Sequence, residues 1–158
     1  MESYDLIGNK HFPANLLRES PEIRRALLEG IIDGDGHLNQ RDGGYLISAK
    51  ERPFIDGLVH LTRSLGFSTG NVGTTTYYNE NTKKEYTGWK KFFSGAEIDT
   101  LQPTLAYKRA PKTNPYKDQR CDSFTVTKVQ GSTYYAFTLE GGGRCLMEDF
   151  VVVDPSLH

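Results

Sequence analysis

Apolar residues recur every three or four positions in two stretches of the chain, residues 21–32 and 51–65, which predicts two helices. The first helix is expected to begin at Pro21, because Ser20 can cap it and proline suits the first turn. Gly66 is expected to stop the second helix. The first helix presents one apolar face, expected to be buried, made of Ile23, Ala26, Leu27, Gly30 and Ile31.

A glycine on that face costs the helix about 1 kcal/mol relative to alanine. Gly30 therefore predicts that another backbone passes close to this helix, most simply a neighbouring helix.

Two pairs of strands are predicted from alternating and β-branched residues between turn signals. Residues 37–40 and 45–50 flank a glycine turn, and residues 71–79 and 85–93 are joined by a polar loop at 80–84. A third helix or a pair of turns is predicted for residues 94–108, bent by its proline. The order is helix, two strands, helix, two strands, helix.

This order predicts an α+β fold, in which four antiparallel strands carry helices on one face and leave the other face free. Polar and basic side chains on the free face can follow a groove of double-stranded DNA, and a solvated sheet face is the alternative. The candidate DNA-contacting residues are Asn39, Arg41, Ser48, Lys50, Thr74, Thr76, Tyr78 and Lys90.

The end of the chain has a different character. A basic, proline-containing connector near residues 110–116 marks a module boundary, so we expect domains at 1–112 and 113–158. The second is expected to be all-β, with short strands within residues 122–139, 144–147 and 150–153. Cys121 and Cys145 lack partners at zinc-ligand spacing and are expected to be small buried residues.

Two carboxylates separated by one glycine, Asp33 and Asp35, follow the first predicted helix. Glycines at 34 and 36 are expected to end that helix, so both acids lie where the helix dipole disfavours negative charge. A divalent metal would supply the missing positive charge and activate a water for phosphodiester hydrolysis. An ordinary Asp-Gly turn remains the alternative, whereas an EF-hand loop would need an oxygen donor at His37 and a glycine at Leu38.

Residues 28–36 read Leu-Glu-Gly-Ile-Ile-Asp-Gly-Asp-Gly, and residues 8–13 read Gly-Asn-Lys-His-Phe-Pro. The first run resembles the LAGLIDADG motif of homing endonucleases, with Glu29 in place of the usual alanine. The substitution is tolerable if position 29 faces outward. The second run is similar to the lead-in of members encoded within inteins. The resemblance implies a half of αββαββα order with a saddle-like sheet.

The resemblance also implies an arrangement in which two such helices pack side by side at a two-fold axis. Because the chain has one copy of the motif, the second helix would come from a homodimer or from a second LAGLIDADG half. Ala26, Gly30 and Gly34 would form this interface. Asp35 would bind the catalytic Mg²⁺, Gly34 would lend it a backbone carbonyl, and Asp33 would be structural.

A basic residue completes the implied active site. After the fourth strand the family carries a lysine near the scissile phosphate, and by resemblance this is Lys108, which would stabilise developing charge or polarise water. A solvated lysine at a helix end is the alternative, because Arg109 and Lys112 lie nearby in the sequence.

The C-terminal segment resembles the last blocks of intein (Hint-like) splicing domains, as in fungal vacuolar-ATPase-type inteins. The chain lacks the terminal His-Asn and the N-terminal half of such domains, so autonomous splicing is not expected. The expected function is site-specific, Mg²⁺-dependent cleavage of double-stranded DNA by a homodimer. The alternatives are a non-cleaving DNA-binding or degenerate intein remnant, and a fragment of a splicing intein.

Composition agrees with a small globular protein. Of the 158 residues, 37% are hydrophobic and 25% charged, and no apolar run is long enough to span a membrane, so we expect an intracellular protein, nuclear if eukaryotic. The net charge of −1 argues against an indiscriminate polyanion binder. Basic residues nevertheless concentrate between residues 83 and 117.

Overall fold

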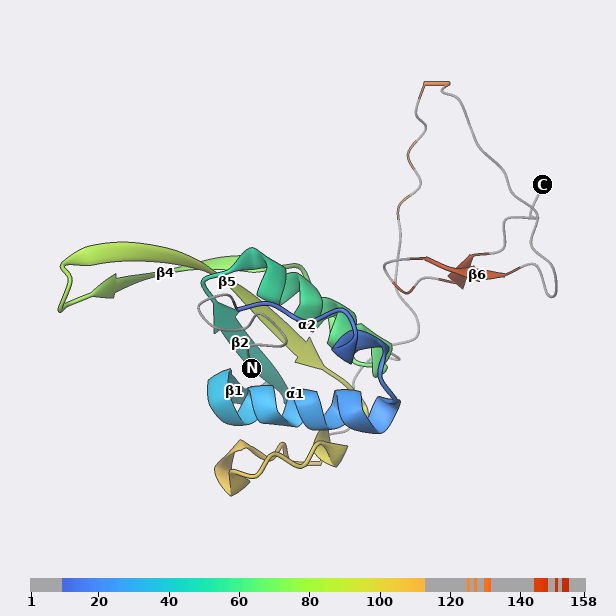
Figure 1. The fold of residues 1–158 in the computed structure, drawn as a ribbon, viewed down its shortest axis with the longest axis horizontal. Helices are drawn as coiled ribbons and strands as arrows, with labels where there is room; N and C mark the ends of the chain where they lie inside the picture. Colours follow the sequence, from blue (N-terminus) through green and yellow to red (C-terminus); the bar gives the residue numbers. More distant parts are fainter. Residues whose placement is uncertain are drawn as a thin grey trace. The chain divides into compact units, whose positions relative to one another are not determined.

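The computed structural model describes residues 10–112, together with residues 125, 127, 130–131, 144–147, 150 and 152–153 (Figure 1). The chain divides by contacts into two compact units, Met1–Gln119 and Arg120–His158, and each is considered by itself. No helix in the described part of the chain is long and apolar enough to cross a membrane.

The second unit contains one short antiparallel pair, β6 (Cys145–Leu146) with β7 (Val152–Val153), among its described residues. The strands predicted within residues 122–139 lie largely outside the described residues, as does Cys121. Cys145 carries a free thiol and is half-buried, so the expectation that it is buried is wrong. The intein-like nature of this unit stays a prediction.

The first unit begins, in its described part, with a short 3₁₀ turn, η2 (Leu16–Arg18), followed by α1 (Pro21–Asp35). The hydroxyl oxygen of Ser20 accepts a hydrogen bond from the Ile23 amide at 3.5 Å, which confirms the predicted start of the helix. The predicted end is only partly correct, because one of the two glycines expected to end the helix does not do so. Gly34 lies inside α1, and only Gly36, which leaves the helix for extended backbone, ends it.

The second helix and the two predicted hairpins are confirmed. The hairpins are β1 (Gly36–Asn39) with β2 (Gly44–Ala49), and β4 (Gly73–Asn79) with β5 (Lys84–Ser94). Between them lies α2 (Arg52–Ser64), after which Gly66 adopts the positive φ of 85° that glycine tolerates best. A two-residue strand, β3 (Ser68–Thr69), was not predicted.

The strands of the first unit form one antiparallel sheet around β5. On one side β5 pairs with β2, which pairs with β1, and on the other side β5 pairs with β3 and β4. The distal hairpin, made of β4, the loop 80–83 and residues 84–88 of β5, extends beyond the helices, and we call it the arm (Figure 1).

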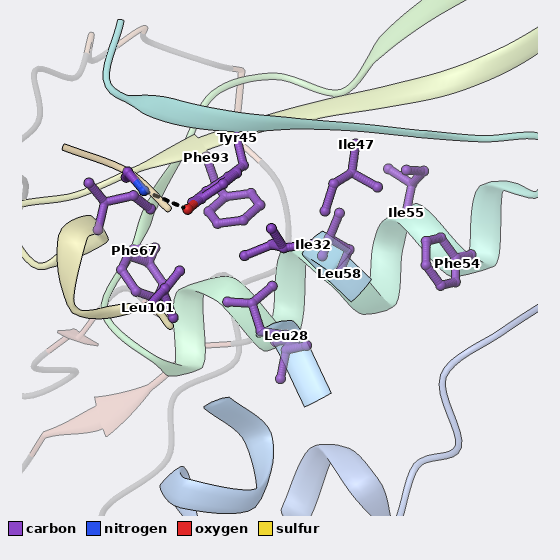
Figure 2. Packing of buried hydrophobic residues seen from close by; sticks show 13 residues of the cluster. Leu28, Ile32, Tyr45, Ile47, Phe54, Ile55, Leu58, Phe67, Phe93 and Leu101 are labelled. Atoms are coloured by element: carbon purple, nitrogen blue, oxygen red, sulfur yellow. Dashed lines mark hydrogen bonds between the residues drawn. The ribbon is translucent and has the colours of Figure 1, made fainter. Parts of the chain in front are cut away.

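Both helices cover the same face of the sheet, which confirms the predicted layering. Figure 2 shows Tyr45, Ile47 and Phe93 of the sheet directed toward Leu28 and Ile32 of α1 and Leu58 of α2. These side chains form the centre of a single hydrophobic core. Burying one large apolar side chain stabilises the fold by about 1.5–3 kcal/mol. We call the opposite side of the sheet the outer face.

The buried face of α1 differs from the predicted one. Leu28 and Ile32 are fully buried, whereas Ile23 is 47% exposed and Ala26 and Gly30 are exposed. Leu28 and Ile32 lie one turn apart, on a different side of the helix from the predicted stripe, and this side faces the sheet. Leu27 and Ile31 are half-buried and belong to the margin between the two sides.

The third helix is absent, and its place is taken by the predicted alternative, a pair of turns. These are η3 (Ile98–Thr100) and η4 (Ala106–Lys108), separated by an extended stretch around Pro103. Proline cannot donate a helical hydrogen bond. The next two amides, of Thr104 and Leu105, donate to a side chain of α1 instead of to a helix of their own. We call residues 100–110 the strap.

Candidate active site and nucleic-acid interface

Asp35, the predicted metal ligand, is the last residue of α1 and immediately precedes β1. Its carboxylate is 43% exposed and forms an ion pair with the Lys10 ammonium. The same ammonium lies 4.6 Å from the centre of the Phe54 ring, which fixes it between an anion and an aromatic face. The positive charge expected at this helix end is thus partly supplied by the chain itself.

Lys10 is a site residue that sequence reasoning missed. It appears in the sequence only as part of the Gly-Asn-Lys-His-Phe-Pro run, 25 positions before Asp35. The signal that could have found it is its charge: Lys10 is the lysine of a run that accompanies the acidic motif, and a lysine can neutralise a carboxylate of that motif. The neighbouring Phe12 stacks on Phe54 at 4.9 Å between ring centres and so anchors this segment on α2.

Asp33 has a structural task, as the resemblance implied. Its carboxylate accepts hydrogen bonds from the amides of Thr104 at 2.8 Å and Leu105 at 3.0 Å. These backbone bonds, the Leu105 amide first, lower the pKa of Asp33, and the nearby charge of Lys108 acts in the same direction. Asp33 therefore holds the strap to the end of α1.

Glu29 holds the same strap one helical turn earlier. Its Oε1 accepts a hydrogen bond from the Gln102 amide at 2.8 Å. The acid that replaces the usual alanine of the motif is therefore half-exposed, in keeping with the outward position that the substitution requires, and is bonded to the strap as well. It forms, with Asp33, a pair of acceptors at positions i and i+4 that face one strand-like segment.

Lys108 lies at the C-terminal end of α1 but is only 9% exposed. Its ammonium donates hydrogen bonds to the carbonyls of Ile32 at 2.8 Å and Asp33 at 2.7 Å. These carbonyls belong to the last turn of the helix and carry the negative end of the dipole, and the Ile32 carbonyl also accepts the backbone N–H of Gly36. The solvated lysine offered as the alternative is thus wrong, and Lys108 caps α1.

Oxygen donors that suit Mg²⁺ are present at this helix end, but few of them are side chains. Asp35 supplies a carboxylate and Gly34 a backbone carbonyl, both of a type that Mg²⁺ prefers. Among the described residues there is no group of three or more His, Cys, Asp or Glu side chains able to hold a metal ion. The donors fit the ion in kind, and one chain supplies them incompletely.

The predicted interface residues form an exposed ridge along α1. Ala26, Gly30 and Gly34 follow one another at intervals of four residues, and all three are exposed. A Cβ built on Gly30 or on Gly34 would meet nothing within 4 Å. The close backbone approach predicted from Gly30 is therefore absent within the described part of the chain, and the ridge is left open.

The predicted DNA-contacting residues divide between the two faces of the sheet. Cα partners in antiparallel strands share a face, so Ser48 and Lys90 lie together on the outer face, and Asn39 follows the same parity. Thr74 pairs with Trp89 and Thr76 with Thr87, which places both on the helix side. Tyr78 has the helix-side parity too, whereas Arg41 and Lys50 lie outside the strands.

The expectation of a single polar surface made of all eight residues is therefore wrong. The physical reason is that the face on which each residue of β4 lies depends on its register with β5, in which even-numbered residues pair with odd-numbered ones, and the sequence does not mark this register. The outer-face residues of β4 are instead Gly73, Thr75, Tyr77 and Asn79.

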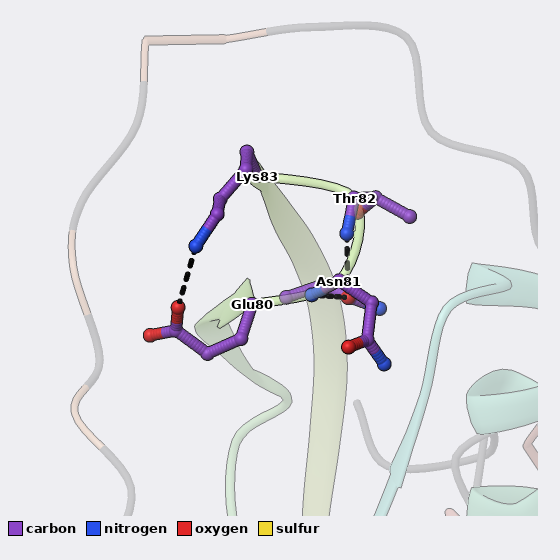
Figure 3. A network of polar contacts seen from close by, with 5 residues as sticks. Glu80, Asn81, Thr82 and Lys83 are labelled. Carbon is purple, nitrogen blue, oxygen red and sulfur yellow. Dashed lines mark hydrogen bonds and ion pairs between the residues drawn. The ribbon is translucent and has the colours of Figure 1, made fainter.

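The basic segment of the sequence is also less concentrated in space than its spacing suggests. Lys91 is 2% exposed, and burial, together with the nearby Arg63 and Arg52, lowers its pKa. Lys108 is buried as well. At the tip of the arm Lys83 pairs with Glu80 at 3.2 Å (Figure 3). The outer face retains Lys84 and Lys90.

A family model described as homing endonuclease matches residues 11–110 of the chain. That range includes α1, the sheet and the strap. The chain belongs to the homing endonuclease family.

A particular relative is the homothallic switching endonuclease of Saccharomyces cerevisiae. It is 29% identical over 167 aligned residues, which cover 94% of this chain and 28% of that protein. The chain thus spans little more than a quarter of the length of the curated relative it matches.

Proposed function

We propose that this chain is the LAGLIDADG half of a homing endonuclease, which cleaves double-stranded DNA as a homodimer with Mg²⁺. The observation that carries the proposal is the combination, on one helix, of an open ridge and a terminal carboxylate. A second α1 laid along Ala26, Gly30 and Gly34 would bring a second Asp35 beside the first. Membership of the homing endonuclease family supports the homing type, and the relative, itself named an endonuclease, supports the same chemistry.

The residues at the helix end would have different roles in this reaction. Asp35 and the Gly34 carbonyl of each subunit would hold the metal, which when bound supplies an activated water and neutralises charge on the phosphate. The Lys10 ammonium balances the carboxylate charge of Asp35. Lys108 uses two of its three N–H groups on α1 carbonyls, so its charge is held at the end of α1, where it would stabilise charge that develops on the phosphate or polarise water.

The cleavage test compares two substitutions that remove the same charge. Asp35→Asn is expected to abolish Mg²⁺-dependent cutting of a randomised duplex library while DNA binding persists. Asp99→Asn, a matched change at η3, is expected to leave both unchanged. Cutting by the Asp35→Asn protein at the wild-type rate would refute the catalytic role of Asp35.

The assembly test places a bulky side chain on the ridge. Gly30→Leu meets nothing within 4 Å at its Cβ and improves helix propensity by about 1 kcal/mol, so the fold should be retained. We expect its mass in gel filtration to fall from dimer to monomer. Gly70→Leu, at an equally open glycine away from α1, should remain dimeric. A dimeric Gly30→Leu protein, or a monomeric wild type, would contradict the homodimer.

A further inference from the structure

The outer face carries a row of one imidazole and two apolar side chains beside the candidate active site. His37, Leu46 and Phe92 are consecutive Cα partners across β1, β2 and β5, so their side chains share the outer face. Leu46 and Phe92 are half-buried, yet neither is among the described hydrophobic residues that form the core or pack against it. The row therefore lies on the side of the sheet that no helix in the described part of the chain covers.

The backbone is adapted to this row. A Cβ built on Gly44 would lie 2.5 Å from Cζ of Phe92, so the Phe92 ring lies against β2 where only a glycine fits. Such packing keeps the ring at the sheet surface rather than free in solvent. The glycine at position 44 weakens β2, and the Phe92 ring packed against it is not part of the hydrophobic core.

A second apolar group lies farther along the same face, on the arm. Tyr77 and Tyr86 are Cα partners, and their rings stack with centres 5.5 Å apart and planes inclined by 17°. Tyr86 and Phe92 lie six residues apart on β5 and share its outer side. At about 3.3 Å per residue their separation is roughly 20 Å, or about six base-pair steps.

Cations alternate with these aromatic groups. Lys84 and Lys90 of β5 have the same parity as Tyr86 and Phe92, and the stem of Lys90 lies over Gly73, where a Cβ would be 3.3 Å from its Cε. A surface of alternating ammonium groups and rings is complementary to a ligand with evenly spaced negative charges and apolar groups between them. Duplex DNA is such a ligand, because its major groove presents the 5-methyl group of thymine between rows of phosphates.

We infer that the pair Leu46 and Phe92 and the pair Tyr77 and Tyr86 are specificity-determining contacts to thymine 5-methyl groups in the major groove. The inference rests on the proposed function, since it needs duplex DNA on the outer face. It assigns thymine preference to two positions about six base pairs apart in each half-site. The position read by Phe92 lies nearer the Asp35 end of the sheet.

The test removes the methyl groups from DNA and leaves the protein intact. Wild-type protein is selected against a randomised duplex library, and the best binders are remade with deoxyuridine at each thymine in turn. We expect affinity to fall about fourfold for each contacted methyl, from the exposure of one methylene-sized group, at two positions per half-site. Equal affinity for every uridine duplex would overturn the inference while DNA binding survives. Failure to bind any duplex would overturn the proposed function and the inference with it.

Variants assign the contacts to residues. Leu46→Gln should remove the uridine effect at the inner position only, and Tyr86→Ser at the outer position only. Thr87→Ala, a neighbouring change on the helix side of the arm, should retain both effects. A uridine effect unchanged in Leu46→Gln and Tyr86→Ser would refute the assignment. A lower oligomeric mass of Leu46→Gln would show instead that a second copy covers this face.

Discussion

Replacing Lys108 by methionine tests whether the strap lysine holds the end of α1 together. Methionine keeps an unbranched side chain but has no N–H donor. The carbonyls of Ile32 and Asp33 would lose the bonds that they now accept from the Lys108 ammonium at 2.8 and 2.7 Å, while Ile32 would keep its bond from the Gly36 amide. The backbone carbonyl of Lys108 itself accepts from the Tyr45 hydroxyl at 2.6 Å, and this contact should persist.

The magnitude follows from opposing contributions. A hydrogen bond from a charged donor contributes about 1.5–3 kcal/mol, and a cation at a helix C-terminus about 0.3–1 kcal/mol. Removing the ammonium also removes the cost of burying a charge, which offsets part of the loss. We expect the free energy of unfolding to fall by about 2–3 kcal/mol, which for a urea m-value of about 1–3 kcal/mol/M lowers the midpoint by about 0.7–3 M.

The assay is urea unfolding followed by far-ultraviolet circular dichroism, with Lys112→Met as the matched control. Lys112 is exposed, so the same chemical change there should shift the midpoint by no more than the effect of a surface substitution, about 0.5 kcal/mol. Equal midpoints for the two variants would refute the capping role of Lys108.

Two further changes probe the strap and the outer face. The pKa of Asp33 is lower in the folded protein than in the unfolded chain, so its carboxylate stabilises the fold above the unfolded-state pKa, and this stabilisation is lost as the pH falls through the folded-state pKa. The difference in unfolding free energy between wild type and Asp33→Asn should therefore shrink below about pH 4. A difference that is constant down to about pH 2 would contradict this. Gly44→Ala should lower the free energy of unfolding by about 1–3 kcal/mol, because its Cβ would lie 2.5 Å from both Phe92 Cζ and the Phe93 carbonyl oxygen. Thermal melts measure this, with Gly70→Ala, which meets nothing within 4 Å, as the control whose melting temperature should not fall.

The sequence predicted the helices, both hairpins and the layering because each depends on local signals. Ser20, Pro21 and Gly66 mark element ends by their own conformational preferences, and the apolar spacing marks the helices. The strap could not be predicted in the same way. Its form depends on amides of Thr104 and Leu105 that find a carboxylate 71 and 72 positions away in the chain.

The candidate site shows the same limit. Asp33 and Asp35 were found from their spacing, but their different tasks are decided by which partner each meets in three dimensions. The side of the sheet reached by each candidate DNA contact was missed because parity in β4 depends on where pairing with β5 begins, at Gly73, and residue types alone do not reveal it.

The tip of the arm is expected to tolerate insertions that the strap does not. Among the described residues, its loop is held by local contacts, in which the Asn79 side chain accepts from the amides of Asn81 and Thr82 (Figure 3). The strap, by contrast, is fixed against two successive turns of α1. An insertion of one or two residues at the tip would lengthen the hairpin without moving Asp35, whereas the same insertion between Thr104 and Lys108 would pull the helix end apart. Under the proposed function, new sequence preferences would therefore arise by remodelling the hairpin while the carboxylate at the helix end is inherited unaltered.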